Sequence, residues 1–299
     1  MVSIIPPAVA AWCAENGWGE VQRTVPLSGG DVSRALRLEM SNGRSLVLKV
    51  KPDAPPEMFA RESEGLAALA DASGPTIPAV YLTGPDFILL EDLRPYPPMP
   101  TYWTEFGLRL AMMHQSPYRI TPKDFPHGPP KPLYGFAHDN YCGETWQPNP
   151  WTEDGHEFFA EHRLRHQARL ARDRERLDSP DLRRIESVCA RLPDLVPPQS
   201  PALIHGDLWS GNALTGPHGE PALIDPAAHF GWAEAELAMT LLFGGFPNAF
   251  YDAYAASYPL APGWRGRADL YNLYHLLNHL NVFGAGYLAR VHDTLCRYS

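Results

Sequence analysis

The sequence predicts an α+β protein with two lobes, a small antiparallel β-sheet lobe with one main helix and a larger, mostly helical lobe. Three observations support this prediction. Apolar and polar residues alternate in short runs within the first hundred residues, which is typical of strands. A proline-rich stretch, RPYPPMP, follows at residues 94–100. The remaining chain carries amphipathic segments with helical period.

Size and charge exclude some classes of function. The chain has 299 residues, enough for one large domain or two lobes, and 44% of them are hydrophobic. A formal net charge of −9 argues against a general nucleic-acid binder. It does not exclude anionic ligands, because a local site can be positive inside an acidic protein. We therefore expect no nucleic-acid partner.

The cysteines and the N-terminus indicate the compartment. The four cysteines lie far apart without a C-x-x-C pair, so neither a zinc ribbon nor a thioredoxin-type site is expected. Free thiols in a reducing cytoplasm are the simpler interpretation. The N-terminus lacks the pattern of a signal peptide, and no stretch approaches about 18 uninterrupted apolar residues. We expect a cytoplasmic protein without a membrane span.

The small lobe is predicted to begin with a short helix and to contain five strands, with one helix after the third strand. Asn42-Gly43 is a strong hairpin signal between the second and third strands. The predicted helices are 6–16 and 56–70, and the predicted strands are 21–27, 35–40, 46–50, 76–80 and 86–90.

A lysine and a glutamate inside apolar segments suggest a nucleotide site. Lys49 lies in the third strand, where a lysine is costly unless it is paired. We interpret it as the strand-three lysine of a kinase lobe, which reaches the α- and β-phosphates of ATP. The alternative is an edge-strand lysine that points to solvent. Glu62, on the apolar face of the following helix, is a better partner than Glu64 on its flank.

The turn between the first two strands is a candidate phosphate-binding loop. Its sequence, SGGDVS, is neither G-x-G-x-x-G nor a Walker A motif, so a plain turn is the simpler interpretation until Lys49 is considered. With Lys49 present, we expect ATP contacts from Gly29, Gly30, Asp31, Val32 and Ser33.

The chain is predicted to cross between the lobes at about residues 91–95. In a two-lobed kinase, backbone groups at this point bond to adenine, and here they belong to Glu91, Asp92 and Leu93. A surface turn is the alternative, since proline-rich stretches mark linkers generally. The predicted division is an N-terminal nucleotide-binding lobe over 1–93 and a C-terminal catalytic and substrate-binding lobe over 94–299.

The larger lobe is predicted to be helical, with two short buried strands near its middle. An ordered, aromatic-rich loop over 125–151 is expected to dock on this lobe. A hairpin near 216–219 is expected to join the two strands. The predicted helices are 101–115, 152–177, 180–191 (ended by Pro193), 234–242, 247–258 and 268–284, and the strands are 202–204 and 222–224.

Polar residues follow both short strands. The first strand leads into HGDLWSGN and the second into Asp225; Asp207 precedes Asn212 by five positions, and Asn212 precedes Asp225 by thirteen. This is the spacing of the protein-kinase catalytic loop H-R-D-L-x-x-x-N and its later metal-binding aspartate. A turn rich in Asp, Ser, Gly and Asn is the alternative, but it does not account for acids placed behind two apolar strands.

The chemistry of phosphoryl transfer assigns roles to these residues, because it needs mainly positioning and charge neutralisation. Asp207 would accept or orient the proton of the substrate hydroxyl. Asn212 and Asp225 would hold Mg²⁺, a hard ion suited to oxygen ligands. His205 would brace the loop from beneath, and Glu236 is expected to cap its backbone amides. ATP and Mg²⁺ are thus the expected cofactors.

Features of protein-kinase regulation are missing. Gly206 replaces the arginine that reads a phosphorylated activation loop, Pro226 replaces the Phe of D-F-G, and there is no A-P-E. A small-molecule kinase fits better than a protein kinase. His275 and His279 form H-x-x-x-H without the glutamate of a metalloprotease or an obvious third ligand, so packing or substrate-pocket roles are favoured over zinc.

Several blocks together resemble the fructosamine kinase (ketosamine-3-kinase) family. They are LIHGDLWSGN, ALIDPAAHFGWAEAELAM, LFGGFPNAFYDAY and LYNLYHLLNHLNVFGAGYL. SGGDVSRALRL with VLKV resembles the N-terminal lobe of the family, and GETWQPNPW resembles its substrate-side loop. The resemblance covers roughly residues 27–288. Aminoglycoside and choline kinases share the HGD…N…D skeleton but not the LWSGN and FGG-Y pieces.

The resemblance implies a protein-kinase-like fold and ATP-dependent phosphorylation of the 3-hydroxyl of a ketosamine, the sugar adduct of an amine, free or on glycated protein lysines. The 3-phosphate is unstable and releases the amine, which repairs the adduct. Trp209 is the candidate to wall the sugar, and His275 is a further substrate-pocket candidate. Asp207 carries over as catalytic base, Asn212 and Asp225 as metal ligands, and Lys49 with Glu62 as the phosphate-positioning pair.

The sequence departs from the pattern of the family at two positions, and two alternative functions are considered. Asp31 stands where some relatives have cysteine, so no redox control by a disulfide in this turn is expected, and Trp146 stands where a smaller residue is expected, which leaves the preferred sugar open. The chain is otherwise a kinase of another small metabolite, such as an aminoglycoside or amino alcohol. A non-catalytic ATP-binding or scaffolding protein is disfavoured because the catalytic set is complete. No oligomeric state is indicated.

Overall fold

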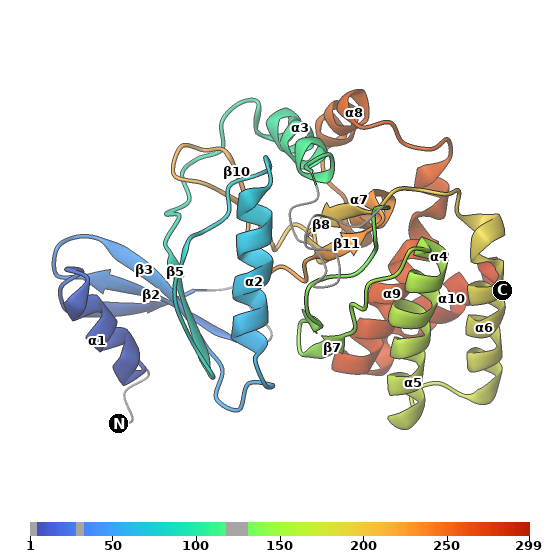
Figure 1. The fold of residues 1–299 in the computed structure, drawn as a ribbon, viewed down its shortest axis with the longest axis horizontal. Helices are drawn as coiled ribbons and strands as arrows, with labels where there is room; N and C mark the ends of the chain where they lie inside the picture. Colours follow the sequence, from blue (N-terminus) through green and yellow to red (C-terminus); the bar gives the residue numbers. More distant parts are fainter. Residues whose placement is uncertain (1–4, 28–32, 118–130) are drawn as a thin grey trace.

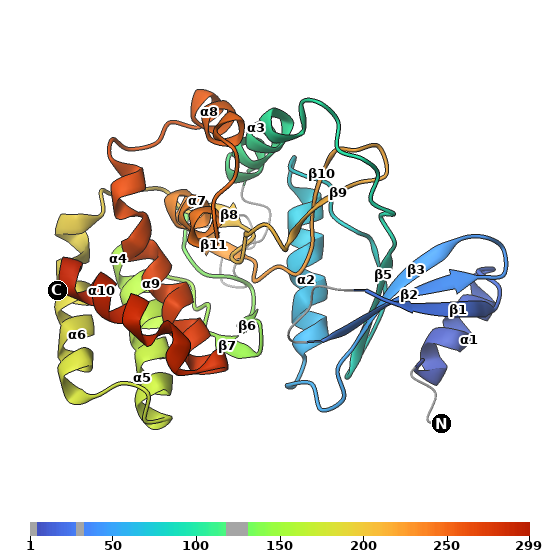
Figure 2. The same cartoon turned by 180° about the vertical axis from the view of Figure 1, so that it is seen from behind.

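The computed structural model describes residues 5–27, 33–117 and 131–299, which form two lobes (Figures 1 and 2). The small lobe is a five-stranded antiparallel sheet of order β1-β2-β3-β5-β4 with two helices. Its elements are α1 (Pro7–Glu15), β1 (Val21–Pro26), β2 (Arg34–Met40), β3 (Ser45–Val50), α2 (Met58–Asp71), β4 (Val80–Gly84) and β5 (Phe87–Glu91).

The two faces of this sheet pack against different helices, because side chains alternate along each strand. Leu36 and Leu38 of β2 pack with Val9 of α1 on one face. Ile88 and Leu90 of β5 pack with α2 on the other face. Successive side chains of a strand point to opposite faces, so the apolar alternation that predicts the strands also places a helix on each side of the sheet.

The strand predicted over 76–80 is wrong. The edge strand β4 begins at Val80, and the residues before it are not part of the sheet. Thr76 instead exchanges backbone hydrogen bonds with the larger lobe: its N–H donates to Pro221 O and its carbonyl accepts from Leu223 N, both at 2.9 Å. Pro78, which has no N–H to give to a ladder, explains why regular pairing starts only after it.

The larger lobe is mostly helical (Figure 1). Residues 92–101 connect the lobes without a helix or strand, and the division predicted at residues 93 and 94 stays a prediction. The elements of the larger lobe are α3 (Tyr102–His114), β6 (Asn140–Cys142), β7 (Thr145–Gln147), α4 (Gly155–Phe159), the π-helix η1 (Ala160–Arg165), α5 (His166–Asp173), α6 (Ser179–Leu195), β8 (Ala202–Ile204), β9 (Ala213–Thr215), β10 (Pro221–Leu223), β11 (His229–Gly231), α7 (Ala233–Leu242), α8 (Asn248–Ser257), α9 (Trp264–Phe283), the 3₁₀ turn η2 (Ala285–Tyr287) and α10 (Leu288–Tyr298).

Several helix predictions need correction. The helix predicted to end before Pro193 continues to Leu195, because a proline in the last turn removes only its own N–H and Val196 N still bonds to Leu192 O. The single helix predicted over 152–177 is α4, η1 and α5, with the π-helical segment in the middle. Helix α10 was not predicted.

The aromatic-rich segment before α4 docks on the larger lobe, as predicted. Its described part, residues 131–151, contains the β6–β7 hairpin. Gly135 exchanges two backbone hydrogen bonds with Phe230 of β11, at 3.0 and 2.8 Å. Residues 125–130 of the predicted loop lie outside the described residues.

The predicted hairpin near 216–219 is present, but it does not join the two strands that precede the polar loops, which do not pair with each other. Strand β8 pairs with β11, and β10 pairs with β9 through the turn at 216–219. The three-residue strands β9 and β11 are too short to produce a periodic signal. Two separate ribbons therefore carry the two polar loops. Among the described residues, no helix is long and apolar enough to cross a membrane.

Helix α3 lies close against the backbone of α8 at Gly107, which gives a test of the fold. A Cβ added there would lie 2.1 Å from Phe250 O, so we expect Gly107→Ala to lower the free energy of unfolding by about 1–3 kcal/mol. Gly266 in α9 has nothing within 4 Å, so Gly266→Ala should raise it by roughly 0.5–1 kcal/mol. Urea unfolding measures both. Equal effects would contradict this packing.

Candidate active site

The loop after β8 is shaped by a glycine. Gly206 has φ +81°, and a Cβ added to it would lie 2.2 Å from Ala227 O. Ala227 N in turn donates to His205 O at 2.8 Å. Only glycine fits this close approach of two backbones without strain, which explains the second letter of HGD.

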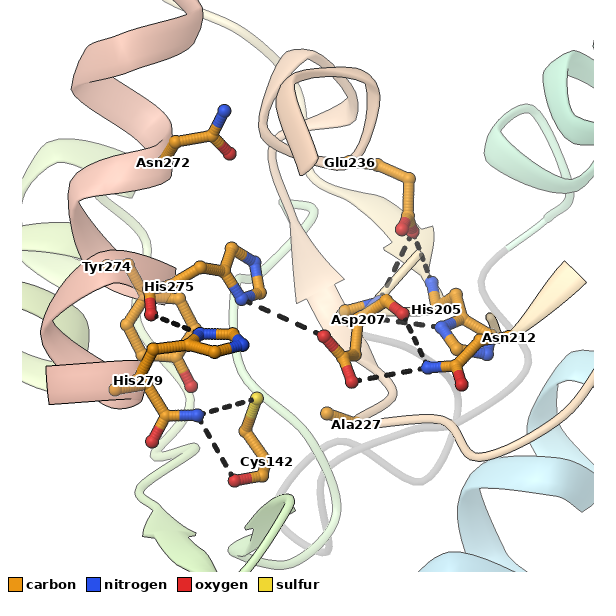
Figure 3. A network of polar contacts seen from close by, with 12 residues as sticks. Cys142, His205, Asp207, Asn212, Ala227, Glu236, Asn272, Tyr274, His275 and His279 are labelled. Carbon is orange, nitrogen blue, oxygen red and sulfur yellow. Dashed lines mark hydrogen bonds and ion pairs between the residues drawn. The ribbon is translucent and has the colours of Figure 1, made fainter. Parts of the chain in front are cut away.

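Glu236 holds the same loop from the first turn of α7. Its Oε2 accepts hydrogen bonds from the backbone N–H groups of His205 and of Gly206, the second at 3.3 Å (Figure 3). Burial raises the pKa of Glu236 to about 8, although these N–H donors favour the ionised form. The carboxylate thus lies where the sequence predicts a cap for the catalytic loop.

His205 links the two polar loops. Its Nε2 lies 2.8 Å from Ile224 O, the carbonyl that precedes Asp225. Burial lowers the pKa of His205 to about 4, so the imidazole is neutral and can donate to this carbonyl. The side chain therefore braces one loop against the other, beneath the polar groups.

Asp207 and Asn212 point toward each other at the mouth of the loop (Figure 3). Asn212 Nδ2 donates to Asp207 O at 2.8 Å and to Asp207 Oδ2 at 3.2 Å. Burial, followed by the charge of Asp225, raises the pKa of Asp207 to about 7, and the bond from Asn212 opposes this rise. A carboxyl group tuned toward neutral pH inside a cleft is typical of a general base.

Lys49, Glu62 and Asp225 form an ion cluster across the two lobes, in which Lys49 and Glu62 are largely buried and Asp225 is partly exposed. Lys49 Nζ lies 2.6 Å from Glu62 Oε1 and 2.9 Å from Asp225 Oδ1. Burial alone would lower the pKa of Lys49, but the two carboxylates outweigh it and raise the pKa above its usual value. Asp225 has φ 58°, a conformation that is rare for residues other than glycine and that is found at functional sites.

A mainly apolar cavity of about 230 Å³ lies between the lobes, bordered by Lys49 and Asp225. It fits the predicted nucleotide site. Asp92 does not offer its carboxylate there, because Arg37 Nε (2.6 Å) and Ser45 Oγ (2.5 Å) bind it. Of the residues predicted to contact ATP, Ser33, Lys49, Glu91, Asp92 and Leu93 line this cavity, and Gly29, Gly30, Asp31 and Val32 lie outside the described residues.

A second cavity, of about 390 Å³, is also lined by Lys49 and Asp225. Trp209 forms part of its wall, with its ring 5.7 Å from that of Phe243. Glu62, Asp207 and Asn212 also line it. His279, for which a packing or substrate-pocket role was predicted, lines this cavity. The sequence prediction gave no site role to several other lining residues, among them Asn140, Tyr141 and Cys142 of the predicted loop over 125–151 and Asn278 of the last predicted helix.

His275 does not line this second cavity. It is buried behind Asp207, with its Nδ1 at 3.9 Å from Asp207 Oδ1 (Figure 3). Its neighbour His279 turns away from it, because His279 Nδ1 bonds to the carbonyl of His275 at 2.7 Å. The two histidines of H-x-x-x-H therefore do not form a common site.

The donor set around Asp225 fits a hard cation. Asn212 uses its Nδ2 for Asp207, which leaves its amide oxygen for a ligand. Asp225 gives Oδ1 to Lys49, and its side chain is 30% exposed. Amide and carboxylate oxygens suit Mg²⁺.

Comparisons with known proteins agree along most of the chain. A family model described as fructosamine kinase matches residues 8–298. A probable ketoamine kinase from Synechocystis sp. is 37% identical, over 92% of this chain and 90% of the relative. A chloroplastic protein-ribulosamine 3-kinase from Oryza sativa subsp. japonica is 32% identical, over 96% of this chain and 82% of the relative.

Solved structures give the same result. The crystal structure of a candidate fructosamine-3-kinase from Thermobifida fusca has a TM-score of 0.82 and 35% identity, over 96% of this chain and 97% of that one. The gentamicin complex of APH(2″)-IIa, with a TM-score of 0.64 and 14% identity over 100% of this chain and 97% of that one, shares the fold alone. The predicted two-lobed, protein-kinase-like α+β fold is confirmed.

The interaction of Glu236 with the loop can be tested by mutation. Glu236→Ala leaves two buried N–H groups without an acceptor, so we expect the free energy of unfolding to fall by about 2–4 kcal/mol. Because the same loop carries Asp207, we also expect the catalytic activity of the protein to fall. Glu236→Gln keeps one acceptor oxygen and should lose less. Urea unfolding at pH 7 compares the variants. A neutral effect of Glu236→Ala would contradict the role of the cap.

The raised pKa of Glu236 also predicts a pH dependence of stability. Burial raises the pKa of Glu236 to about 8 in the folded protein, whereas the ordinary pKa of a glutamate side chain is 4.5. The contribution to stability is therefore complete below 4.5 and is lost as pH rises through about 8. Glu236→Gln, which does not titrate, should show a flatter profile than wild type in this window. Parallel profiles would show that the N–H donors keep the group ionised.

Proposed function

The chain belongs to the fructosamine kinase family, and from that premise we propose that it transfers the γ-phosphoryl group of ATP to the 3-hydroxyl of a ketosamine. The acceptor is of the fructosamine or ribulosamine type, and its amine is free or belongs to a protein lysine. The observation that carries the proposal is the convergence of Lys49, Asp207, Asn212 and Asp225 between an apolar cavity and a cavity walled by Trp209.

The first cavity would hold the nucleotide. We assign adenine to its apolar part, which residues 91–93 line, and the phosphates to its border at Lys49. Glu62 keeps Lys49 in place through their 2.6 Å contact. Asn212 and Asp225 would hold Mg²⁺, which when bound neutralises charge on the β- and γ-phosphates.

The second cavity would hold the acceptor. Asp207 lies at its border, where its carboxylate would orient the 3-hydroxyl and accept its proton as the bond to phosphorus forms. Trp209 offers a ring face to the apolar side of the sugar. Gly206, His205 and Glu236 do not touch the substrate; they fix the position of Asp207 through the loop backbone.

The reaction and its acceptor can be tested together. The protein is incubated with ATP, Mg²⁺ and fructosyl-, ribulosyl- and erythrulosyl-lysine, and with an aminoglycoside and choline as alternative acceptors. We expect a 3-phosphate from at least one ketosamine. Turnover of the alternative acceptors alone would identify a different small-molecule kinase and overturn the proposal.

Asp207 can be tested in the same assay. We expect Asp207→Asn to lower kcat by about 10²–10⁴, the range for a general base. Asp269→Asn is the matched control, because this exposed carboxylate pairs only with Arg297 on the surface in the contacts described. An Asp207→Asn variant as active as the control would refute the role of Asp207.

The pH dependence of the reaction follows from the same residue. Burial raises the pKa of Asp207 from 3.8 to about 7, and a bound cation would lower it again. Only the ionised carboxylate accepts a proton, so kcat/KM should fall as pH falls, with a midpoint between 3.8 and about 7. Rates with saturating ATP and Mg²⁺ test this. The residual rate of Asp207→Asn should lack this limb, and an identical limb in that variant would contradict the assignment.

A further inference from the structure

Behind the catalytic loop, three side chains from distant parts of the chain converge on one point (Figure 3). They are Cys142 of β6, Asp207 of the loop after β8, and His275 of α9. Their ligand atoms all lie within 4.8 Å of one another. The cluster is separate from the predicted Mg²⁺ site, because Asp207 faces His275 with Oδ1 and Asn212 with Oδ2.

His275 supplies an independent sign of a ligand. Its Nδ1 is buried and has no hydrogen-bond partner, and its side chain is only 8% exposed. Buried polar atoms are nearly always satisfied, so such an atom needs a physical reason. Burial lowers the pKa of His275 to about 3, so the imidazole is neutral, which is the form that binds metals.

The donor set selects the kind of metal. A thiol, an imidazole and a carboxylate are ligands of Zn²⁺, whereas Mg²⁺ prefers oxygen atoms alone. Tetrahedral zinc places neighbouring ligand atoms roughly 3.3–3.7 Å apart. The 3.9 Å between His275 Nδ1 and Asp207 Oδ1 is close to this spacing. The ligand atoms lie within 4.8 Å of one another, so side-chain rotations that move an atom by roughly 1 Å would bring all three to zinc-binding distance. The fourth position remains for water.

We propose that Cys142, Asp207 and His275 bind Zn²⁺, and that the bound ion inhibits phosphoryl transfer by occupying the catalytic carboxylate. The ion would enter through the acceptor cavity, which Cys142 and Asp207 both line. On binding, the Cys142 thiol releases its proton to solvent and the thiolate coordinates the ion. Zinc binding does not depend on the proposed function, but the inhibition rests on it.

Metal binding is tested without reference to activity. Protein stripped of metal is titrated with Co²⁺ in excess Mg²⁺, and the thiolate-to-cobalt charge-transfer absorption reports whether a thiolate binds. Calorimetric titration with Zn²⁺ in excess Mg²⁺ measures the affinity of every variant, including those without Cys142. We expect one equivalent per chain and at least a tenfold weaker affinity in both Cys142→Ser and His275→Gln. Cys189→Ser and Cys296→Ser, which remove a buried and an exposed thiol elsewhere, should bind as wild type. Wild type without this absorption, or with affinity that survives in both cluster variants, would overturn the site.

Inhibition is tested with the ketosamine found to be the acceptor, at saturating ATP and Mg²⁺. Each variant is compared with its own rate without zinc, so that losses of basal activity do not enter. We expect the zinc concentration for half inhibition to rise at least tenfold in Cys142→Ser and His275→Gln relative to wild type and the two control variants. Equal inhibition of all variants would overturn the inhibitory role. If no acceptor is phosphorylated, the proposed function fails, while the cobalt titration still decides the metal site.

Discussion

The structure depends most on the buried contacts of Lys49. This lysine comes from the sheet, Glu62 from α2 and Asp225 from the larger lobe, 176 positions away in the sequence. A buried charge that loses its partner costs about 3–5 kcal/mol. The three side chains therefore hold the lobes at a defined approach, and both cavities border on this cluster.

The same cluster sets the electrostatics of the catalytic loop. Burial, and after it the negative charge of Asp225, raises the pKa of Asp207. The backbone N–H groups of His205 and Gly206 do not stabilise the ionised form of Asp207, because they donate to Glu236 instead. In the proposed mechanism, a cation at Asp225 would reduce this repulsion, so that nucleotide binding and proton acceptance by Asp207 would be coupled.

Periodicity predicted much of this arrangement but not the contacts between distant segments. It identified Lys49 on a strand and Glu62, rather than Glu64, on the buried face of α2. It found the short strands β8 and β10 but missed β9 and β11, and it failed where pairing crosses the lobes, as at Thr76 with β10. The convergence of Cys142 and His275 on Asp207 leaves no local pattern, because these residues are more than sixty positions apart.

The backbone at position 206 has no room for the arginine that protein kinases carry at this point of the catalytic loop. Protein kinases place an arginine at this point to read a phosphorylated loop. Here a Cβ would lie 2.2 Å from Ala227 O, and the left-handed backbone at φ +81° would strain any side chain. Ala227 cannot move away freely, because its N–H bonds to His205 O. Since Ala227 follows Asp225 by two positions, the close contact that excludes the arginine also fixes the spacing between the two catalytic loops.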